Sequence, residues 1–341
     1  MRAVGARALA LAAPAKVNLG LRILGRRSDG YHLLESLFLP LELADAIEVS
    51  VGPSEAGDVA VQLEVLGERS EGVPADASNL AARAAAGFLE AGGVDGLAVR
   101  IRLEKRIPAQ AGLGGGSSDA AAVLRALATL LPRTLEDGPL RGLALRLGAD
   151  VPFFLDPRPA RVGGIGERID PVEWVSPLWL MLVHPGVGLA TAEVYAAYDA
   201  LEAALTPAEA GPTVRPPGGP LDPPALAGLL ESGVRNDLEP AAVRLCPLVA
   251  RLRREIAATG ALGVGMSGSG PTLFGVFEDE RSARAAASRL EERGASARTG
   301  RGDAAAGRDS SRPRRWIQVT RTASAPAPIG RIREIDRWGV A

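Results

Sequence analysis

Apolar and polar residues alternate along some stretches of the chain and recur at helical spacing along others. Alternation or short apolar runs predict strands over residues 12–24, 45–51, 59–66, 97–103, 178–183, 271–277 and 316–321. Helical spacing predicts helices over residues 79–91, 140–147, 236–258 and 281–293, with Asp76 or Ser78 as a candidate cap of the first. Residues 45–51 and 59–66 are predicted to pair with each other.

The stretch from Pro108 to Leu124 joins a glycine-rich half to an alanine-rich half with helical spacing. Four glycines lie within residues 112–116, and Ser117 and Ser118 follow them. Glycines let the backbone approach a ligand, and the helix start presents unpaired N–H groups, so the stretch predicts an anion site for phosphates. The alternatives are a plain turn and a serine that only caps the helix. The P-loop pattern is absent.

A second glycine stretch, Gly263 to Gly268, satisfies the spacing G-x-G-x-x-G. A dinucleotide-binding loop follows a strand and opens a helix, whereas here a predicted helix precedes and a predicted strand follows. A second loop that closes over the first glycine loop is the better interpretation.

Composition limits the classes of protein that the chain can belong to. With 341 residues, 47% of them hydrophobic, two domains with real cores are expected. A net charge of −1 argues against a general role in binding nucleic acid or membrane surfaces. One cysteine and two histidines leave no intramolecular disulfide and no zinc cluster, and favour a reducing cytoplasm. No apolar run reaches transmembrane length, and the N-terminal run, which could mimic a signal peptide, is interpreted as a first strand.

Lysine is rare here: 39 residues are Lys or Arg, but only Lys16 and Lys105 are lysines. Each of these lysines is expected to be needed for its compact ammonium group. The alternative is that either lysine is present by chance. Asp150 follows a glycine turn, where it could cap a helix or act on a hydroxyl in phosphoryl transfer. Tyr31 and His32 follow a polar turn and could stack on or bond a base, or be purely structural. Thr191 could be a simple helix cap.

Five blocks of the sequence resemble the GHMP kinase superfamily, in order along the chain. These blocks are 13–19, 25–32, 108–118, 148–152 and 265–271. The resemblance implies an α+β kinase with an N-terminal ribosomal-S5-like domain (residues 1–165), a C-terminal ferredoxin-like α/β sandwich (166–322) and an appended, disordered tail (323–341). An insert at residues 295–314 and this tail are longer than the family pattern needs.

The resemblance also implies the reaction and the residues that carry it. ATP would phosphorylate a tertiary hydroxyl of a cytidine-diphosphate-linked small molecule on the non-mevalonate route to isoprenoid precursors. Lys16 and Asp150 would be the catalytic pair, with Asp150 as base. The nucleotide would contact Asn79, Lys105, Pro108, Ala109, Gln110, Ala111, Gly112, Leu113, Gly114, Gly115, Gly116, Ser117 and Ser118. The substrate would contact Asn18, Tyr31, His32, Thr191 and Tyr195, with the two tyrosines on either side of the cytosine.

Mg²⁺ is expected because phosphates must be neutralised during transfer, although the sequence identifies no ligand beyond a guess at Ser118. A monomer or weak homodimer without nucleic-acid or membrane partners is expected. Two rivals stay open: another small-alcohol kinase of the superfamily, for homoserine or mevalonate, and a non-catalytic nucleotide sensor.

Overall fold

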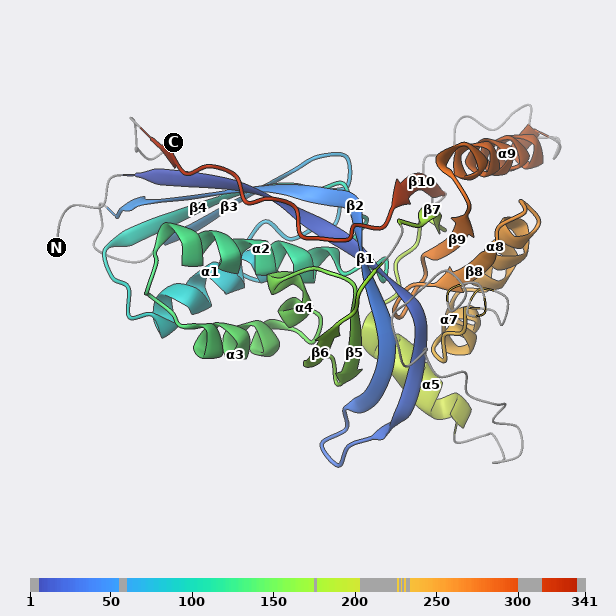
Figure 1. Ribbon diagram of the computed structural model, residues 1–341, viewed down its shortest axis with the longest axis horizontal. Coiled ribbons are helices and arrows are strands. Elements are labelled where there is room, and N and C mark those ends of the chain that lie inside the picture. Colours follow the sequence, from blue (N-terminus) through green and yellow to red (C-terminus); the bar gives the residue numbers. More distant parts are fainter. Residues whose placement is uncertain are drawn as a thin grey trace.

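The computed structural model describes residues 6–54, 60–174, 177–202, 226, 228, 230, 234–299 and 315–335. Its strands form one sheet of seven strands and one of four (Figure 1). The larger sheet contains β1 (Arg7–Arg26), β2 (His32–Pro53), β3 (Ala60–Leu66), β4 (Leu97–Glu104), β5 (Ala160–Gly164), β6 (Arg168–Pro171) and β11 (Arg333–Glu334). The smaller sheet contains β7 (Trp179–His184), β8 (Gly263–Met266), β9 (Leu273–Phe277) and β10 (Trp316–Arg321). No helix of the described residues is long and apolar enough to span a membrane.

The long antiparallel pair β1 and β2 is the frame of the larger sheet, whose main path runs β11-β1-β2-β4-β3. The start of β1 and the end of β2 lie within this path, whereas residues 34–38 of β2 pair with β5. The β1–β2 register shifts between Pro14 and Lys16 and again between Asn18 and Leu21. Such irregularities bend and twist a strand and redirect its side chains. Lys16 and Asn18 therefore lie where the strand changes direction.

Four helices pack under the larger sheet, as Figure 1 shows. They are α1 (Leu80–Ala91), α2 (Gly115–Leu130), α3 (Asp137–Leu147) and α4 (Val151–Leu155). Alanine and leucine side chains of α2 and the apolar face of β1, β2 and β4 form one buried cluster with Phe88, Phe153 and Phe154. Burial of this apolar face drives the helices onto the sheet.

The smaller sheet has the order β10-β7-β9-β8 and packs with a second set of helices. These are α5 (Thr191–Glu202), α7 (Glu239–Leu245), α8 (Leu248–Ala257) and α9 (Glu280–Thr299). A separate apolar cluster joins the two sheets, with Val17 and Leu39 on one side and Leu182 and Phe274 on the other. This shared core holds the middle of β1 against the loop that follows β8.

The segment after β10 returns to the larger sheet. The Ala323 N–H donates to the Pro40 carbonyl, and the Gly330 N–H donates to the Ala10 carbonyl. β11 then pairs antiparallel with β1, so that the last described strand covers the edge of the first (Figure 1). The expectation of a disordered tail is wrong for residues 323–335, because backbone hydrogen bonds fix them along this edge. The insert at 295–314 lies mostly outside the described residues.

Three further expectations about the elements are wrong. Strand β3 pairs in parallel with β4 and not with residues 45–51, because β4 comes between them. The predicted helix over 236–258 is two helices, α7 and α8, interrupted at Cys246 and Pro247. The proposed domain boundary after residue 165 falls inside the β5–β6 hairpin, so we place the start of the second unit after β6.

Candidate active site

One cavity of about 940 Å³ lies where the two sheets meet. It is lined by both units, from β1 and the glycine loop on one side to α5 and the loop after β8 on the other. The residues predicted for catalysis and binding that line it are Lys16, Asn18, Tyr31, His32, Asn79, Lys105, residues 108–117, Asp150, Thr191 and Tyr195. Of the predicted set, only Ser118 is not among the lining residues.

The glycine loop leads directly into α2. Gly114 takes the cap position with φ 72°, and the first helical hydrogen bond runs from the Ser118 N–H to the Gly114 carbonyl, at 2.9 Å. No side chain caps this helix, so the interpretation of Ser117 or Ser118 as a cap is wrong. The N–H groups of residues 115–117 have no partner within the helix. A helix start with free N–H groups, facing a cavity, is suited to phosphate oxygens.

Glycine is required in this loop because its neighbours leave no space. A Cβ atom at Gly114 would lie 2.8 Å from Phe154 Cζ and 3.2 Å from Lys16 Cγ. A Cβ atom at Gly112 would lie 2.2 Å from the carbonyl oxygen of Ser267. The backbone of the loop is thus pressed between β1, α4 and the loop after β8.

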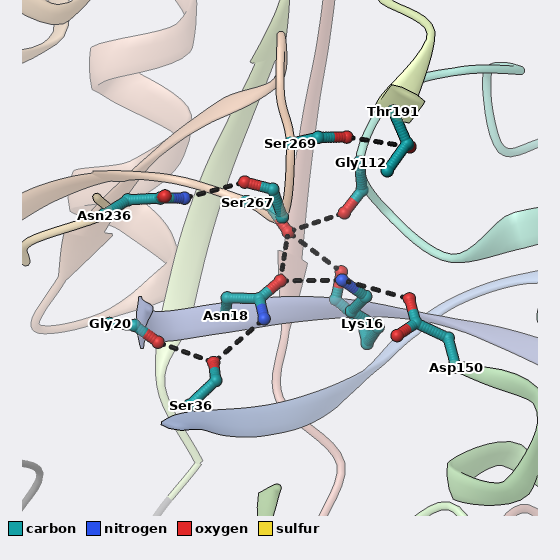
Figure 2. A network of polar contacts seen from close by, with 11 residues as sticks. Lys16, Asn18, Gly20, Ser36, Gly112, Asp150, Thr191, Asn236, Ser267 and Ser269 are labelled. Carbon is teal, nitrogen blue, oxygen red and sulfur yellow. Dashed lines mark hydrogen bonds and ion pairs between the residues drawn. The ribbon is translucent and has the colours of Figure 1, made fainter. Parts of the chain in front are cut away.

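Lys16 and Asp150 meet beside this loop (Figure 2), with Lys16 Nζ 3.5 Å from Asp150 Oδ2. The Lys16 side chain is 3% exposed, and its Nζ donates to Asn18 Oδ1 at 2.6 Å and lies 4.8 Å from the centre of the Phe38 ring. Asp150 occupies the cap position of α4 but makes no capping bond, which removes the alternative that it only caps a helix. The Asp150 side chain is 33% exposed and so stays accessible from the cavity.

Asn18 holds Lys16 in place through a chain of hydrogen bonds. Its Nδ2 donates to Ser36 Oγ at 2.9 Å, and Ser36 Oγ donates to the Gly20 carbonyl at 2.6 Å (Figure 2). Both polar atoms of the Asn18 amide therefore have partners in the protein. The geometry makes Asn18 the residue that positions the ammonium group, while its predicted contact with substrate stays a prediction.

The loop after β8 closes over the glycine loop, as its sequence predicted. Ser267 Oγ donates to the Gly112 carbonyl at 2.9 Å (Figure 2), and Asn236 Nδ2 donates to the carbonyls of Met266 and Gly268. Thr191, the first residue of α5, places its hydroxyl 3.0 Å from Ser269 Oγ. Because β8 precedes this loop and β9 follows it, the dinucleotide interpretation is excluded.

We expect Gly112→Ala to disrupt the contact between the two loops. The new methyl group would overlap the Ser267 carbonyl, in addition to the strain of a positive φ of 74°. Gly96→Ala is the matched control, because φ is 70° there and no atom lies within 4 Å. The control should lose about 1–2 kcal/mol of unfolding free energy with its KM for ATP unchanged. Gly112→Ala should lose more and raise that KM, as measured by urea unfolding and steady-state kinetics. Equal effects of the two variants would contradict this role of the loop contact.

Lys105 lies beneath the glycine loop in a buried cluster of three ionisable groups. Its Nζ contacts Asp45 Oδ2 and, at 2.7 Å, Asp119 Oδ2, while Asp45 Oδ1 accepts from the Ile107 N–H at 2.9 Å. Burial lowers the pKa of Lys105, but the two carboxylates outweigh it and the net shift is upward. Burial also raises the pKa of Asp119 to about 7, against the opposing attraction of Lys105. Lys105 is thus engaged by two protein carboxylates, and its predicted contact with nucleotide stays a prediction.

The raised pKa of Asp119 predicts how stability depends on pH. The folded state holds the Asp119 proton up to about pH 7, whereas an unfolded chain releases it near pH 4, so this group makes unfolding easier as pH rises between the two. We expect the wild type to lose on the order of 2 kcal/mol from this source between pH 5 and pH 8. Asp119→Asn should remove that slope, whereas Asp95→Asn, at an exposed loop position, should keep it in urea unfolding at the two pH values. A slope that persists in Asp119→Asn would refute the assignment.

Aromatic residues form the far wall of the cavity. The His32 and Tyr195 rings lie 4.8 Å apart at 30°, and His32 Nε2 is 2.6 Å from Asp199 Oδ1. Burial, followed by the nearby Asp150 charge, raises the pKa of Tyr195 to about 12, so its hydroxyl stays protonated and its ring can serve as a stacking surface. Tyr31 is 59% exposed at the rim, where its pairing with Tyr195 around a base stays a prediction.

Asn79 caps α1, since its Oδ1 accepts from the Ala81 N–H at 2.9 Å. The expected caps, Asp76 and Ser78, bond each other in the turn before the helix. Asn79 also lines the cavity, so a nucleotide contact stays a prediction.

Sequence reasoning missed Asp45, Asp119 and Asp199. Asp119 directly follows the two serines of the loop, and a buried Lys105 nearby needs a carboxylate, so this partner could have been found. Asp199 lies one helical turn after Tyr195, and the spacing of four residues places both on one face of α5. Asp45 gives no comparable signal. Among the described residues, no three His, Cys, Asp or Glu side chains are grouped as metal ligands.

The comparisons with known proteins agree with this geometry. The family model "GHMP kinases N terminal domain" matches residues 79–156, and "GHMP kinases C terminal" matches residues 222–296. A crystal structure of 4-(cytidine 5'-diphospho)-2C-methyl-D-erythritol kinase superposes with a TM-score of 0.65 and 38% identity, covering 92% of this chain and 99% of that one. Homoserine kinase from Cytophaga hutchinsonii superposes with a TM-score of 0.61 at 18% identity over 98% of both chains, which shows the fold alone. The two-domain α+β architecture is that of the GHMP kinases.

Sequence relatives narrow the family further. A protein of Symbiobacterium thermophilum named 4-diphosphocytidyl-2-C-methyl-D-erythritol kinase is 43% identical over 282 residues, which are 82% of this chain and 93% of that protein. One of the same name from Anaeromyxobacter dehalogenans is 44% identical over 284 residues, covering 82% and 84% of the two chains. The chain belongs to the 4-diphosphocytidyl-2-C-methyl-D-erythritol kinase family and is a small-molecule kinase.

Proposed function

We propose that this protein transfers the γ-phosphoryl group of ATP to the 2-hydroxyl of 4-diphosphocytidyl-2-C-methyl-D-erythritol, in the synthesis of isoprenoid precursors. The observation that carries the proposal is the pair of Lys16 Nζ and Asp150 Oδ2, 3.5 Å apart beside a glycine loop that opens a helix. Membership of the family supplies the substrate, and the cavity supplies a place where the donor and the acceptor can meet.

In the proposed mechanism, the attacking hydroxyl oxygen bonds to the γ-phosphorus of ATP as the bond from that phosphorus to the leaving ADP breaks, and Asp150 accepts the proton of the hydroxyl. The carboxylate is accessible from the cavity, as a base must be. Lys16 Nζ has three hydrogens, and Asn18 and Asp150 face two of them. The third can bond an oxygen of the transferred group, whose charge the buried ammonium group offsets.

The residues around the helix start fit a triphosphate. The N–H groups of residues 115–117 are free of helical partners, and a side chain at Gly114 or Gly112 would meet protein atoms within 3 Å. Mg²⁺ would neutralise the charge of bound phosphates. It takes oxygen ligands, most of which come from phosphate and water. Asp119 lines the cavity, and its Oδ1 has no hydrogen-bond partner among the described residues, so this oxygen would hold such an ion once Asp119 has lost its proton. Ser118 Oγ also has no partner among the described residues, but Ser118 does not line the cavity.

The base of the substrate is proposed to lie against the aromatic wall. Tyr195 and Tyr31 would stack on the cytosine, His32 would bond its edge, and Thr191 would contact the polar groups near the loop after β8. This wall favours a nucleotide-bearing acceptor over homoserine or mevalonate, which have no base to stack. The sensor alternative is disfavoured because Lys16 and Asp150 are both present and paired.

A substrate-dependent assay of ADP release tests the function. With Mg²⁺ and ATP, the cytidine-bearing substrate should support turnover, whereas homoserine and mevalonate should support little or none. Phosphorus NMR of the product should show a new phosphomonoester on the tertiary carbon. Turnover with homoserine or mevalonate alone would identify a different kinase of the superfamily, and ATP binding without any transfer would identify a sensor.

We also propose that the protein works in the cytoplasm as a monomer or weak homodimer, without nucleic-acid or membrane partners. The single cysteine, Cys246, is free and buried, which suits a reducing compartment. Sedimentation at micromolar concentration measures the oligomeric state.

A further inference from the structure

We propose that Asp199 is a specificity-determining positioning residue, which holds the His32 ring in the tautomer that reads an amino group on the base. The inference rests on the proposed function, because it assumes that the base of a nucleotide-linked substrate reaches His32. Under this proposal, Asp199 determines whether His32 accepts a base with an amino group or a base with a carbonyl group at the contacted edge.

The contact between the two residues fixes the location of the hydrogen on the ring. His32 Nε2 lies 2.6 Å from Asp199 Oδ1, and an ionised carboxylate can only accept, so Nε2 donates. In the neutral ring, Nδ1 then carries a lone pair and no hydrogen. Within the described part of the chain, Nδ1 of His32 has no hydrogen-bond partner. It is not one of the fully buried polar atoms that lack a partner, so Nδ1 is not fully buried. Since His32 lines the cavity, this acceptor is available to a ligand.

The surroundings prevent the ring and the carboxylate from turning. Tyr195 stacks on the imidazole at 4.8 Å, and Tyr198 meets it edge-on at 5.9 Å and 83°. The second carboxylate oxygen, Asp199 Oδ2, lies 3.2 Å from Arg26 Nη1, while Arg26 Nε donates to the Gly30 carbonyl. Asp199 therefore also ties α5 of the second unit to the tip of the β1–β2 hairpin.

This arrangement distinguishes two pyrimidines that differ at one edge position. Cytosine carries an exocyclic amino group there, which can donate to a bare Nδ1. Uracil carries a carbonyl oxygen, whose lone pairs would face the lone pair of Nδ1. A buried polar atom left without a partner is costly, so the uracil analogue is disfavoured.

Asp199→Asn should weaken this preference, and the reason is geometric. Arg26 only donates, so it selects the oxygen of the new amide and turns the amide nitrogen toward His32. Nε2 must then accept, the ring hydrogen moves to Nδ1, and the ring becomes a donor suited to a carbonyl. The side chain keeps its size, so the packing of Tyr195 and Tyr198 is conserved.

The experiment compares cytidine- and uridine-diphosphate-linked forms of the same substrate by kcat/KM, and CDP with UDP by calorimetry. The wild type should prefer the cytidine ligands by on the order of 10- to 100-fold. Asp199→Asn should lower this ratio at least about 10-fold, with kcat at saturation much less affected than KM. Glu202→Gln, which removes a carboxylate from the same helix where it bonds the Tyr198 hydroxyl, should keep the wild-type ratio.

An unchanged ratio in Asp199→Asn, including an equal loss for both bases, would overturn the proposal and leave the proposed function standing. A wild type that neither binds CDP nor phosphorylates the cytidine substrate would instead overturn the proposed function itself. A reduced ratio in Asp199→Asn that Glu202→Gln reproduces would show a general effect of charge on α5 and also overturn the specific role of Asp199.

Discussion

Asp150→Asn is expected to lower kcat by about 10²-fold or more, which is the usual contribution of general acid–base catalysis. ATP binding should stay close to that of the wild type. The amide has the size of the carboxylate but cannot accept the proton of the attacking hydroxyl. Because Asp150 makes no capping bond to α4, its replacement should not disturb that helix. Steady-state kinetics with the cytidine substrate and calorimetry with a non-hydrolysable ATP analogue measure the two quantities.

The control for this variant is Asp156→Asn, which changes a carboxylate at the other end of α4 that pairs with Arg158 on the surface. Its kcat should equal that of the wild type. Unchanged turnover in Asp150→Asn would remove this residue from the chemistry. A parallel loss of ATP binding would show that the carboxylate acts in donor binding.

Lys16→Arg is expected to be nearly as damaging as Lys16→Ala, although it keeps the positive charge. The ammonium group fits between Asn18 Oδ1 at 2.6 Å and the Phe38 ring, in a side chain that is 3% exposed. A Cβ atom at Gly268 would lie only 3.2 Å from Nζ, so little space surrounds the group. A planar guanidinium is larger and directs its hydrogens differently. It should therefore displace Asp150 or the loop after β8.

Turnover of both Lys16 variants is measured alongside their thermal unfolding, so that misfolding is separated from lost chemistry. The control is Arg22→Lys, which replaces one type of cationic side chain by the other on the same strand. Arg22 pairs with Glu35, and its replacement should change turnover and stability little. Near-normal activity of Lys16→Arg would mean that only the charge matters at this position.

Local sequence signals identified residues that the structure brings together at the cavity. The glycines before α2, the isolated Lys16 and the Gly-x-Gly stretch before β9 each carry a backbone or charge requirement that can be recognised without a fold. The structure brings Lys16, Asp150 and the loop together, although their assigned roles stay predictions. What the residues alone could not decide was whether Asp150 caps a helix, because that depends on where α4 begins.

The errors concern partners that lie far away in the sequence. The pattern of residues 59–66 predicts a strand but not its neighbour, and β4, which follows after α1, takes the inner place. The apolar spacing of residues 236–258 continues through Pro247 and so predicts one helix, although the helix is interrupted there. Leu245 and Leu248, on either side of the break, are 42% and 40% exposed. Lys105 could be recognised as unusual, but its two carboxylates come from β2 and α2 and only folding brings them together.

The pairing of β11 with β1 has a consequence for how the protein is made. The ribosome makes β1 before β11, so the outer edge of β1 has no partner until β11 has been synthesised. An uncovered edge strand pairs readily with other chains. Translation products that stop before residue 333 should thus self-associate more than chains that include β11, because this strand protects the edge of β1 against aggregation.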